Sequence, residues 1–311
     1  MSTMLAALRP LRTELLGIAG LSALLLLAAG FVAARLLALD LPAACLDPES
    51  IDPACLGRRI DAMEYQAFAS SWTGGIAYIA TLFPAVAGVI LGIAAVAKEL
   101  DQRTAVLAWS VGPSRRKWLL QRVVPLLGVI ALLGLGSTEL FAAMMRLNNG
   151  GVDIAAIPDF EHIAVSGFGP LAGGVSAFGI TIVVGAMLGR LLPGLMAAAA
   201  FVVFAALLIQ QGNDRLIAGE SLVADVAQAG PGRQVESVLR TPDGQILSWG
   251  DAYPQYVDPN NGQLIGGAVE MVRYAPIEIL PEVAARYVLL HLLVGLTALT
   301  LAFAVVERRS P

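Results

Sequence analysis

Long apolar runs separated by polar segments dominate this sequence. Six runs of about 20 mostly apolar residues are each long enough to cross a hydrocarbon core about 30 Å thick. They begin near Leu15, Thr73, Trp118, Gly169, Pro193 and Arg286. The pattern predicts an all-α polytopic membrane protein with six transmembrane helices. The fifth run, 193–211, follows the fourth so closely that the two form a helical hairpin with a tight turn.

The polar segments alternate in charge along the chain. Basic residues gather before the first run, between the second and third, between the fourth and fifth, and after the sixth, as Arg9, Arg12, Arg190, Arg308, Arg309 and the basic residues of segment 98–122. Segments 40–72, 146–168 and 212–285 are richer in acids. Because Lys and Arg concentrate in cytoplasmic loops, both termini are predicted to be cytoplasmic.

The composition supports the membrane assignment. Hydrophobic residues make up 57% of the 311 residues and charged residues 14%, and the mean hydropathy of +0.73 lies outside the range of soluble domains. A cleaved signal peptide is the alternative for the N-terminus. The apolar run from Leu15 to Leu39 is too long for a signal h-region, and Pro42 stands where a lipoprotein cleavage box has Leu.

Segment 212–283 is too long for a plain loop. Residues 235–240, the turn 241–244 and residues 245–249 predict a β-hairpin, and residues 258–262 predict a second turn. We expect a small, partly β extracytoplasmic cap between helices 5 and 6. It divides the chain into a membrane part at 1–211, the cap, and a last helix with its cytoplasmic tail at 284–311. The aromatic residues Trp249, Tyr253 and Tyr256 form either a ligand contact or the core of this cap.

The two cysteines, Cys45 and Cys55, lie in the predicted outer loop at 40–72. An oxidising outer face favours a disulfide between them. The alternative is a metal site built from Asp47, Glu49 and Asp52, although any solvated acidic loop has this spacing.

Two ionisable residues interrupt the apolar runs. Glu139 lies about six turns past Trp118, and His291 lies in the last run. An ionisable group at membrane depth is a candidate for a functional site, so both are candidates for a transport path. Alternatively, Glu139 reaches outer water or pairs with Arg146 or Arg286, and His291 forms an interhelical hydrogen bond.

Segment 98–122 is the most basic part of the chain. It holds six basic and two acidic residues, a net charge of +4 in a chain of net charge −4. If it is helical, one face carries Leu100, Thr104, Leu107 and Val111 and the other carries Lys98, Gln102, Ala105 and Trp109. Gly112 and Pro113 end this helix, and Ser114 is placed to cap the next one. The segment is therefore either a docking surface or a charged loop that fixes topology.

Several catalytic motifs are absent from the sequence. It has no G-x-x-x-x-G-K-[ST] phosphate loop and no H-E-x-x-H motif. We therefore expect that the chain is not an enzyme by itself, holds no cofactor or metal, and binds no nucleic acid.

Segment 98–118 resembles a loop of bacterial ABC-transporter permeases of the type-two exporter class. In that loop an acidic residue, a Gly-Thr pair, a small apolar block and an SRRRW tail recur. The matching residues here are Glu99, Thr104, Leu107, Trp109, Ser114, Arg115, Arg116 and Trp118, and Arg103 stands where the family usually has Gly. Residues 185–197 and 274–276 are also similar to segments of these permeases, so the resemblance covers helices 2 to 6.

The resemblance implies a permease subunit of an ATP-driven exporter in a bacterial cell membrane. It implies two kinds of protein partner, a cytoplasmic ABC ATPase that holds ATP and Mg²⁺ and a second permease copy, identical or related. The coupling segment is 98–117, with Glu99, Gln102, Thr104 and Trp109 as partner-facing or hinge positions. Lipid surrounds the helices. The sequence lacks the E-A-A-Gly signature of importers, which favours export.

Two other functions stay open at this stage. One is a membrane sensor or anchor whose cap binds a ligand and whose cytoplasmic loop recruits a soluble protein. The other is an intramembrane enzyme that uses Glu139 and His291.

Overall fold

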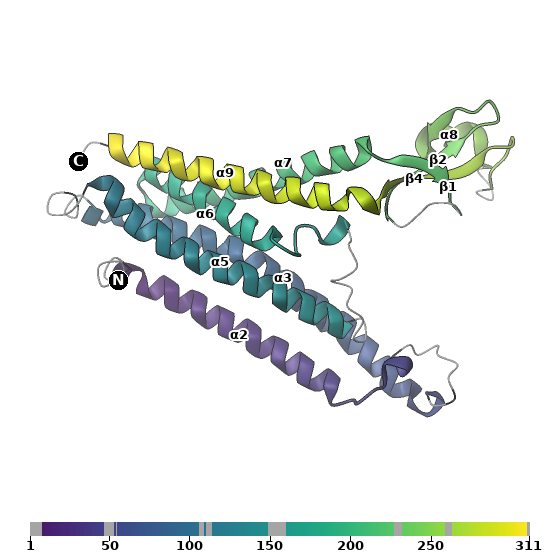
Figure 1. Cartoon of the computed structure of the whole chain (residues 1–311), viewed down its shortest axis with the longest axis horizontal. Helices are drawn as coiled ribbons and strands as arrows, with labels where there is room; N and C mark the ends of the chain where they lie inside the picture. Colours follow the sequence, from purple (N-terminus) through teal and green to yellow (C-terminus); the bar gives the residue numbers. More distant parts are fainter. Residues whose placement is uncertain are drawn as a thin grey trace. The chain divides into compact units, whose positions relative to one another are not determined.

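The computed structural model describes residues 8–46, 53, 55–105, 109, 114–148, 160–226, 232–258 and 263–309. Within these residues six helices are long and apolar enough to cross a membrane (Figure 1), which confirms the predicted architecture. They are α2 (Arg12–Leu37), α3 (Arg59–Asp101), α5 (Arg115–Asn148), α6 (Gly169–Leu188), α7 (Leu191–Gly219) and α9 (Leu280–Arg308). Short 3-10 helices flank them at Arg9–Leu11, Ala43–Cys45, Leu56–Arg58, Phe160–His162 and Ile277–Ile279.

The chain divides into two compact units. The first comprises Met1–Ile157, Ala164–Leu207 and Val288–Pro311, and the second comprises Pro158–Ile163 and Leu208–Tyr287. The boundary falls within α7 and within α9. The first unit therefore holds most of the membrane-spanning length, and the second holds the segment predicted as a cap.

Helix α6 forms the centre of the first unit, and most of its side chains are buried. Close approach depends on glycine. A Cβ on Gly88 of α3 would lie 2.7 Å from the carbonyl oxygen of Gly174 of α6, and a Cβ on Gly134 of α5 would lie 2.6 Å from the Cα of Leu171 of α6. Small residues let helix backbones pack closely in a membrane, where packing rather than water drives association.

Contacts at the helix ends show that α2 and α3 run antiparallel, that α3 and α5 do so too, and that α6 and α9 end on the same side. The start of α2 pairs with the end of α3 through Glu14 and Lys98, 2.6 Å apart. The Arg309 guanidinium, just past α9, donates to the carbonyl of Ala186 near the end of α6. At the opposite ends, the Tyr65 hydroxyl of α3 donates to the carbonyl of Leu147 of α5 at 2.5 Å. Figure 1 shows the start of α2 and the end of α9 on the same side of the helix bundle. That side is the predicted cytoplasmic side.

Helix α3 is longer than the sequence suggested. The outer loop was predicted to extend to residue 72, but α3 begins at Arg59. Its added turns bury Ala62, Tyr65 and Ala69, and the last two pack against α2 and α5 in one apolar cluster. The spacing of three and four residues between these positions is helical. Because small and polar residues stand between them, the mean hydropathy of residues 59–72 is below that of a membrane span. The apolar pattern therefore predicted a helix that starts only near Thr73.

The second unit contains an antiparallel sheet in the order β1-β4-β2-β3. Its strands are β1 (Leu222–Asp225), β2 (Gly232–Arg240), β3 (Ile246–Ser248) and β4 (Val269–Pro276), with helix α8 at Trp249–Tyr256. The predicted hairpin is confirmed, since β2 pairs with β3 and the Gly244 amide donates to the Thr241 carbonyl at 2.9 Å. A bridge joins Val257 and Leu264 on either side of the second predicted turn, of which residues 259–262 lie outside the described residues.

Two of the three cap aromatics lie in its core. Trp249 and Tyr256 pack against the buried residues Leu239, Ala252 and Val257. Of the two roles considered, the structure therefore supports the core for these two, and the side chain of Tyr253 lies outside the described part of the structure. The sequence pattern had placed Trp249 at the end of a strand, but it begins α8 instead, because Ser248 caps this helix by accepting the Asp251 amide.

Candidate functional site

The candidate site is the polar connection between α3 and α5, which we call the coupling segment and define as residues 98–117. Helix α3 ends at Asp101, and the amides of Gln102 and Arg103 donate to the carbonyls of Lys98 and Leu100. Arg103 then adopts a left-handed conformation with φ +57°. Such a residue commonly ends a helix, and it is usually glycine. The chain therefore makes a tight turn here, with Arg103 in the place where the resembling permeases have Gly.

This turn corrects one prediction. A single helix was expected from residue 100 to residue 111, but it is broken at 102–103, and helix resumes at Thr104–Ala105. The physical reason is that the orphan carbonyls at the end of α3 are satisfied by the turn rather than by a further helical turn. The predicted positions Leu107, Val111, Gly112 and Pro113 lie outside the described residues.

A buried ion pair lies directly behind the turn. The Arg122 guanidinium of α5 donates to the Glu99 carboxylate of α3 at 2.5 Å, and the two residues are 7% and 6% exposed. Glu99 was predicted as either a partner-facing or a hinge position. The structure places its side chain in the interior, behind the turn. Removing one member of such a pair strands a buried charge, so the pair holds the ends of α3 and α5 together.

Two tryptophans, Trp109 of the coupling segment and Trp118 of α5, pack next to the buried ion pair. The rings of Trp109 and Trp118 meet edge to face, with centroids 5.6 Å apart. The Arg122 guanidinium lies over the Trp118 ring at 4.3 Å and the Arg115 guanidinium over the Trp109 ring at 4.8 Å. Edge-to-face rings and stacked guanidinium groups each add to the stability of a partly buried site. Trp109 is half-buried, so it both packs on the helices and reaches the surface.

Gln102 and Thr104 are the exposed predicted positions of the segment. The Thr104 hydroxyl donates to the backbone carbonyl of Glu99 at 3.2 Å, which fixes the turn to the last residues of α3. The structure therefore brings all four predicted residues to one place. Two of them are available to a partner, Trp109 is partly available, and Glu99 supports them from inside.

The start of α5 is joined to the end of α9. The Ser114 hydroxyl accepts the Lys117 amide at 3.5 Å, as predicted for a helix cap. Arg116 pairs with Glu307 at 3.0 Å, and the Arg115 guanidinium donates to the carbonyls of Glu307 and Arg309. We call these contacts, which lie on the predicted cytoplasmic side, the cytoplasmic clasp. Much of the positive charge of the coupling segment is therefore offset by acids and carbonyls from other helices, which a charge count along the sequence does not reveal.

Arg122, Glu14 and Glu307 were not predicted as site residues. Each is an ordinary charged residue at the end of an apolar run, and its partner is 23 to 191 positions away along the chain. The available signal was that opposite charges stand at helix ends on the same predicted side of the membrane. That pattern indicates which helix ends lie on the same side of the membrane, but it does not predict which charged residues form ion pairs.

The two candidates for a transport path differ in exposure. Glu139 is exposed on α5, whereas His291 is 4% exposed on α9. The structure therefore places only Glu139 at a surface of the chain. Among the described residues, no group of three or more His, Cys, Asp or Glu side chains is arranged to hold a metal ion.

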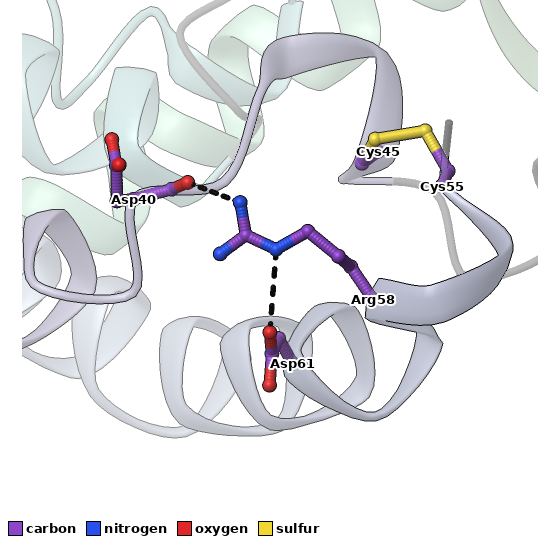
Figure 2. The surroundings of a disulfide bond; sticks show 5 residues. All are labelled: Asp40, Cys45, Cys55, Arg58 and Asp61. Carbon is purple, nitrogen blue, oxygen red and sulfur yellow. Dashed lines mark hydrogen bonds and ion pairs between the residues drawn. A yellow bond between two sulfur atoms is a disulfide. The ribbon is translucent and has the colours of Figure 1, made fainter.

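The predicted disulfide between Cys45 and Cys55 is present. Figure 2 shows the Arg58 guanidinium next to it, between Asp40 and Asp61. Arg58 donates to the backbone carbonyls of Asp40 at 2.6 Å and Leu39 at 2.7 Å, and its Nε lies 3.4 Å from the Asp61 carboxylate. These contacts join the end of α2 to the start of α3. The alternative metal ligands Asp47, Glu49 and Asp52 lie outside the described residues.

Comparison with known proteins gives one match. The family model described as ABC-2 membrane transporter related matches residues 16–212, which include α3, the coupling segment, α5 and α6. Neither the curated proteins nor the solved structures contain a match to the chain.

Proposed function

Because the chain belongs to the ABC-2 membrane transporter related family, we propose that this permease-type, multi-pass membrane protein is the transmembrane subunit of an ATP-driven exporter. The partner implied by the family is an ABC ATPase. ATP and Mg²⁺ bind to that partner, since this sequence has no phosphate loop. Two copies of the chain, or one copy with a related permease, assemble on two ATPase subunits in a cell membrane and form the substrate path between them.

The observation that carries this proposal is the position of the coupling segment. Its exposed residues Gln102 and Thr104 lie at a turn whose two sides are held by the buried Glu99–Arg122 pair. A force on this turn acts on α3 and α5 together, because separating them would strand a buried charge. An exposed turn that is rigidly attached to two membrane helices is the kind of element that can transmit motion from a soluble partner.

The cytoplasmic clasp extends this transmission. Arg115 and Arg116 at the start of α5 contact Glu307 at the end of α9, and Arg309 contacts the end of α6. Closure of the ATPases on nucleotide displaces the turn, and α3, α5, α6 and α9 follow as a packed body. Packed helices have a small number of alternative positions, so nucleotide binding biases which of them is populated.

Co-purification with the ATPase tests the proposal. The full chain is expressed together with a candidate ABC ATPase subunit, and ATPase activity is measured for the complex and for the ATPase alone. We expect Gln102→Lys and Trp109→Ala to reduce both recovery of the ATPase and stimulation of its activity, because they alter the exposed part of the coupling segment. Gln211→Lys, the same substitution at an exposed glutamine of α7, is the matched control. Normal recovery and stimulation with both coupling variants would show that the docking site lies elsewhere.

A further inference from the structure

Arg115 of α5 is fixed by contacts that leave its charge without a counterion. Its Nη1 donates to the backbone carbonyl of Glu307 at 3.1 Å and to that of Arg309. Carbonyls are neutral, so these bonds position the guanidinium without cancelling its charge, and the Glu307 carboxylate pairs with Arg116 instead. The Nε and Nη2 nitrogens of Arg115 form no hydrogen bond within the described part of the chain. Two donor nitrogens of this cation are therefore left for another group.

Trp109 adds a further donor next to this guanidinium. The Arg115 guanidinium lies over the Trp109 ring, 4.8 Å from its centroid, and the Trp109 Nε1 is buried without a hydrogen-bond partner among the described residues. Buried polar groups in native proteins are nearly always paired, and an indole N–H can only donate. The residue as a whole is half-buried, so a turn of its ring presents the N–H at the surface. The group that completes this site is therefore an acceptor.

The chemistry of these donors favours a carboxylate as that acceptor. A guanidinium binds the two oxygens of a carboxylate through two parallel hydrogen bonds. The uncancelled charge of Arg115 also favours an anion over a neutral acceptor. Of the two acids in the coupling segment, Glu99 is bound to Arg122, and Asp101 forms no ion pair within the described residues. The described part of the chain therefore does not supply this carboxylate.

The site lies over the end of the helix bundle. Arg309, whose carbonyl accepts from Arg115, donates to the carbonyl of Ala186 near the end of α6. Helix α6 forms the centre of the first unit, so contacts that converge on its end face the predicted cytoplasm rather than the lipid-facing sides of the bundle. A soluble protein reaches this place, whereas the phosphates of lipids lie around the perimeter.

From these observations we propose that Arg115 and Trp109 bind the carboxylate of one aspartate or glutamate side chain of the partner ATPase. The inference rests on the proposed function, which supplies this partner, and adds the chemistry of the contact. The carboxylate accepts from Arg115 through both oxygens and from the Trp109 N–H once the ring has turned. This is a single directed contact, so a positive charge added elsewhere on the turn, as in Gln102→Lys, does not strengthen it.

Binding of a candidate ABC ATPase to the full chain in detergent tests the contact. Trp109→Phe keeps the ring that Arg115 and Trp118 contact and removes only the N–H. We therefore expect binding to weaken about tenfold, while the free energy of unfolding is unchanged. Arg115→Gln is expected to weaken binding about tenfold or more. The matched controls are Trp72→Phe and Arg12→Gln, at two exposed residues outside the site, and both are expected to bind the ATPase as the unmodified chain does.

Carbodiimide cross-linking identifies the partner carboxylate. In Arg115→Lys/Lys117→Arg the amine at position 115 faces the proposed carboxylate. A water-soluble carbodiimide joins the two as an amide, and the reagent takes up the water as a urea. We expect peptide mass spectrometry to find this amide between position 115 and one Asp or Glu of the ATPase. The control is Lys117→Arg alone, in which the Arg115 guanidinium does not form such an amide, so no cross-link at position 115 is expected.

The inference and the proposed function fail under different results. Normal binding by both Trp109→Phe and Arg115→Gln, with no cross-link at position 115, would overturn the inference and leave the proposed function intact. An unmodified chain that neither binds nor stimulates the ATPase would overturn both. If Arg115→Gln bound the ATPase normally but carried fewer phosphatidylglycerol molecules in native mass spectrometry, Arg115 would belong to a lipid phosphate site and the inference would be wrong.

Discussion

The Arg122 guanidinium donates to the Glu99 carboxylate at 2.5 Å across the two helices that the coupling segment connects. Glu99 lies in the last turn of α3 and Arg122 in the second turn of α5, and both are buried. The pair therefore joins the two helices that flank the segment, while Gln102 and Thr104 stay exposed. If the proposed function is correct, this pair contributes both to stability and to coupling with the ATPase. Variants of the pair can measure the two contributions separately.

Removing one charge of the pair is expected to be strongly destabilising. Glu99→Ala leaves the Arg122 guanidinium buried without its carboxylate, and we expect the free energy of unfolding to fall by about 3–5 kcal/mol. Equilibrium unfolding in detergent measures this. The exposed pair of Arg35 and Glu64 is the comparison, because Glu64→Ala at a half-exposed site is expected to cost at most about 1 kcal/mol. Similar losses for the two variants would mean that burial does not determine the strength of the Glu99 contact.

Replacing both charges is expected to restore stability without restoring coupling. In Glu99→Leu/Arg122→Met no charge remains buried, so we expect the free energy of unfolding to return to within about 1–2 kcal/mol of the unmodified chain. Stimulation of the partner ATPase is expected to stay low, since the turn is no longer joined to α5 by a directional contact. Full stimulation by the stable double variant would show that packing alone transmits the motion.

The membrane spans were predictable because a span requires only about 20 consecutive, mostly apolar residues, and such a run can be found in the sequence alone. The site was predictable only in part. Segment 98–122 was found from its charge, but the position of Glu99 within it was not, because burial of a carboxylate requires Arg122 from the next helix. The prediction of a helix through 102–103 was wrong for a related reason. Arg103 has no sequence signature of a left-handed residue, which Gly would have supplied.

The start of α3 was also mispredicted because its packing partners lie on another helix. Tyr65 and Ala69 stand among polar residues that end the apolar run, yet they pack in one cluster with Phe141 and Met144. Their helical spacing was visible, but the partners that make it meaningful come from α5. The disulfide was predictable because the chain has two cysteines, one possible pairing and a loop on the oxidising side.

Glycine packing between α6 and α9 gives a further prediction. A Cβ on Gly179 would meet the backbone carbonyl of Gly295, which cannot move without moving α9. Gly179→Ala is therefore expected to lower the free energy of unfolding by about 1–3 kcal/mol through overpacking. Gly173→Ala in the same helix is the matched control, since its Cβ would meet nothing within 4 Å. If both variants unfold alike, α6 and α9 are not in close contact at this position.

Removing the disulfide is expected to affect stability but not coupling. The bond closes a loop with a sequence separation of 10, and its loss is expected to cost about 2–3 kcal/mol in the chain-entropy model. Cys45→Ser/Cys55→Ser should unfold at a lower denaturant concentration and become insensitive to added reductant. Stimulation of the ATPase should stay normal, because Arg58 still joins α2 to α3 through the carbonyls of Leu39 and Asp40. Lost stimulation in a variant of unchanged stability would contradict this assignment.

The backbone of Arg103 gives the last prediction. Its φ of +57° is unfavourable for a residue with a Cβ, at a cost of about 1–2 kcal/mol that glycine avoids. Arg103→Gly is expected to raise the free energy of unfolding by about 0.5–1 kcal/mol, since the greater freedom of glycine in the unfolded chain offsets part of the gain. Arg103→Asn, which tolerates this conformation, is expected to be near neutral, and Arg103→Val is expected to lose about 1–2 kcal/mol. All three variants remove the same charge, so differences among them report the backbone alone. If the three were equally stable, the turn would not require a left-handed residue, and the end of α3 would be determined by the Glu99–Arg122 pair instead.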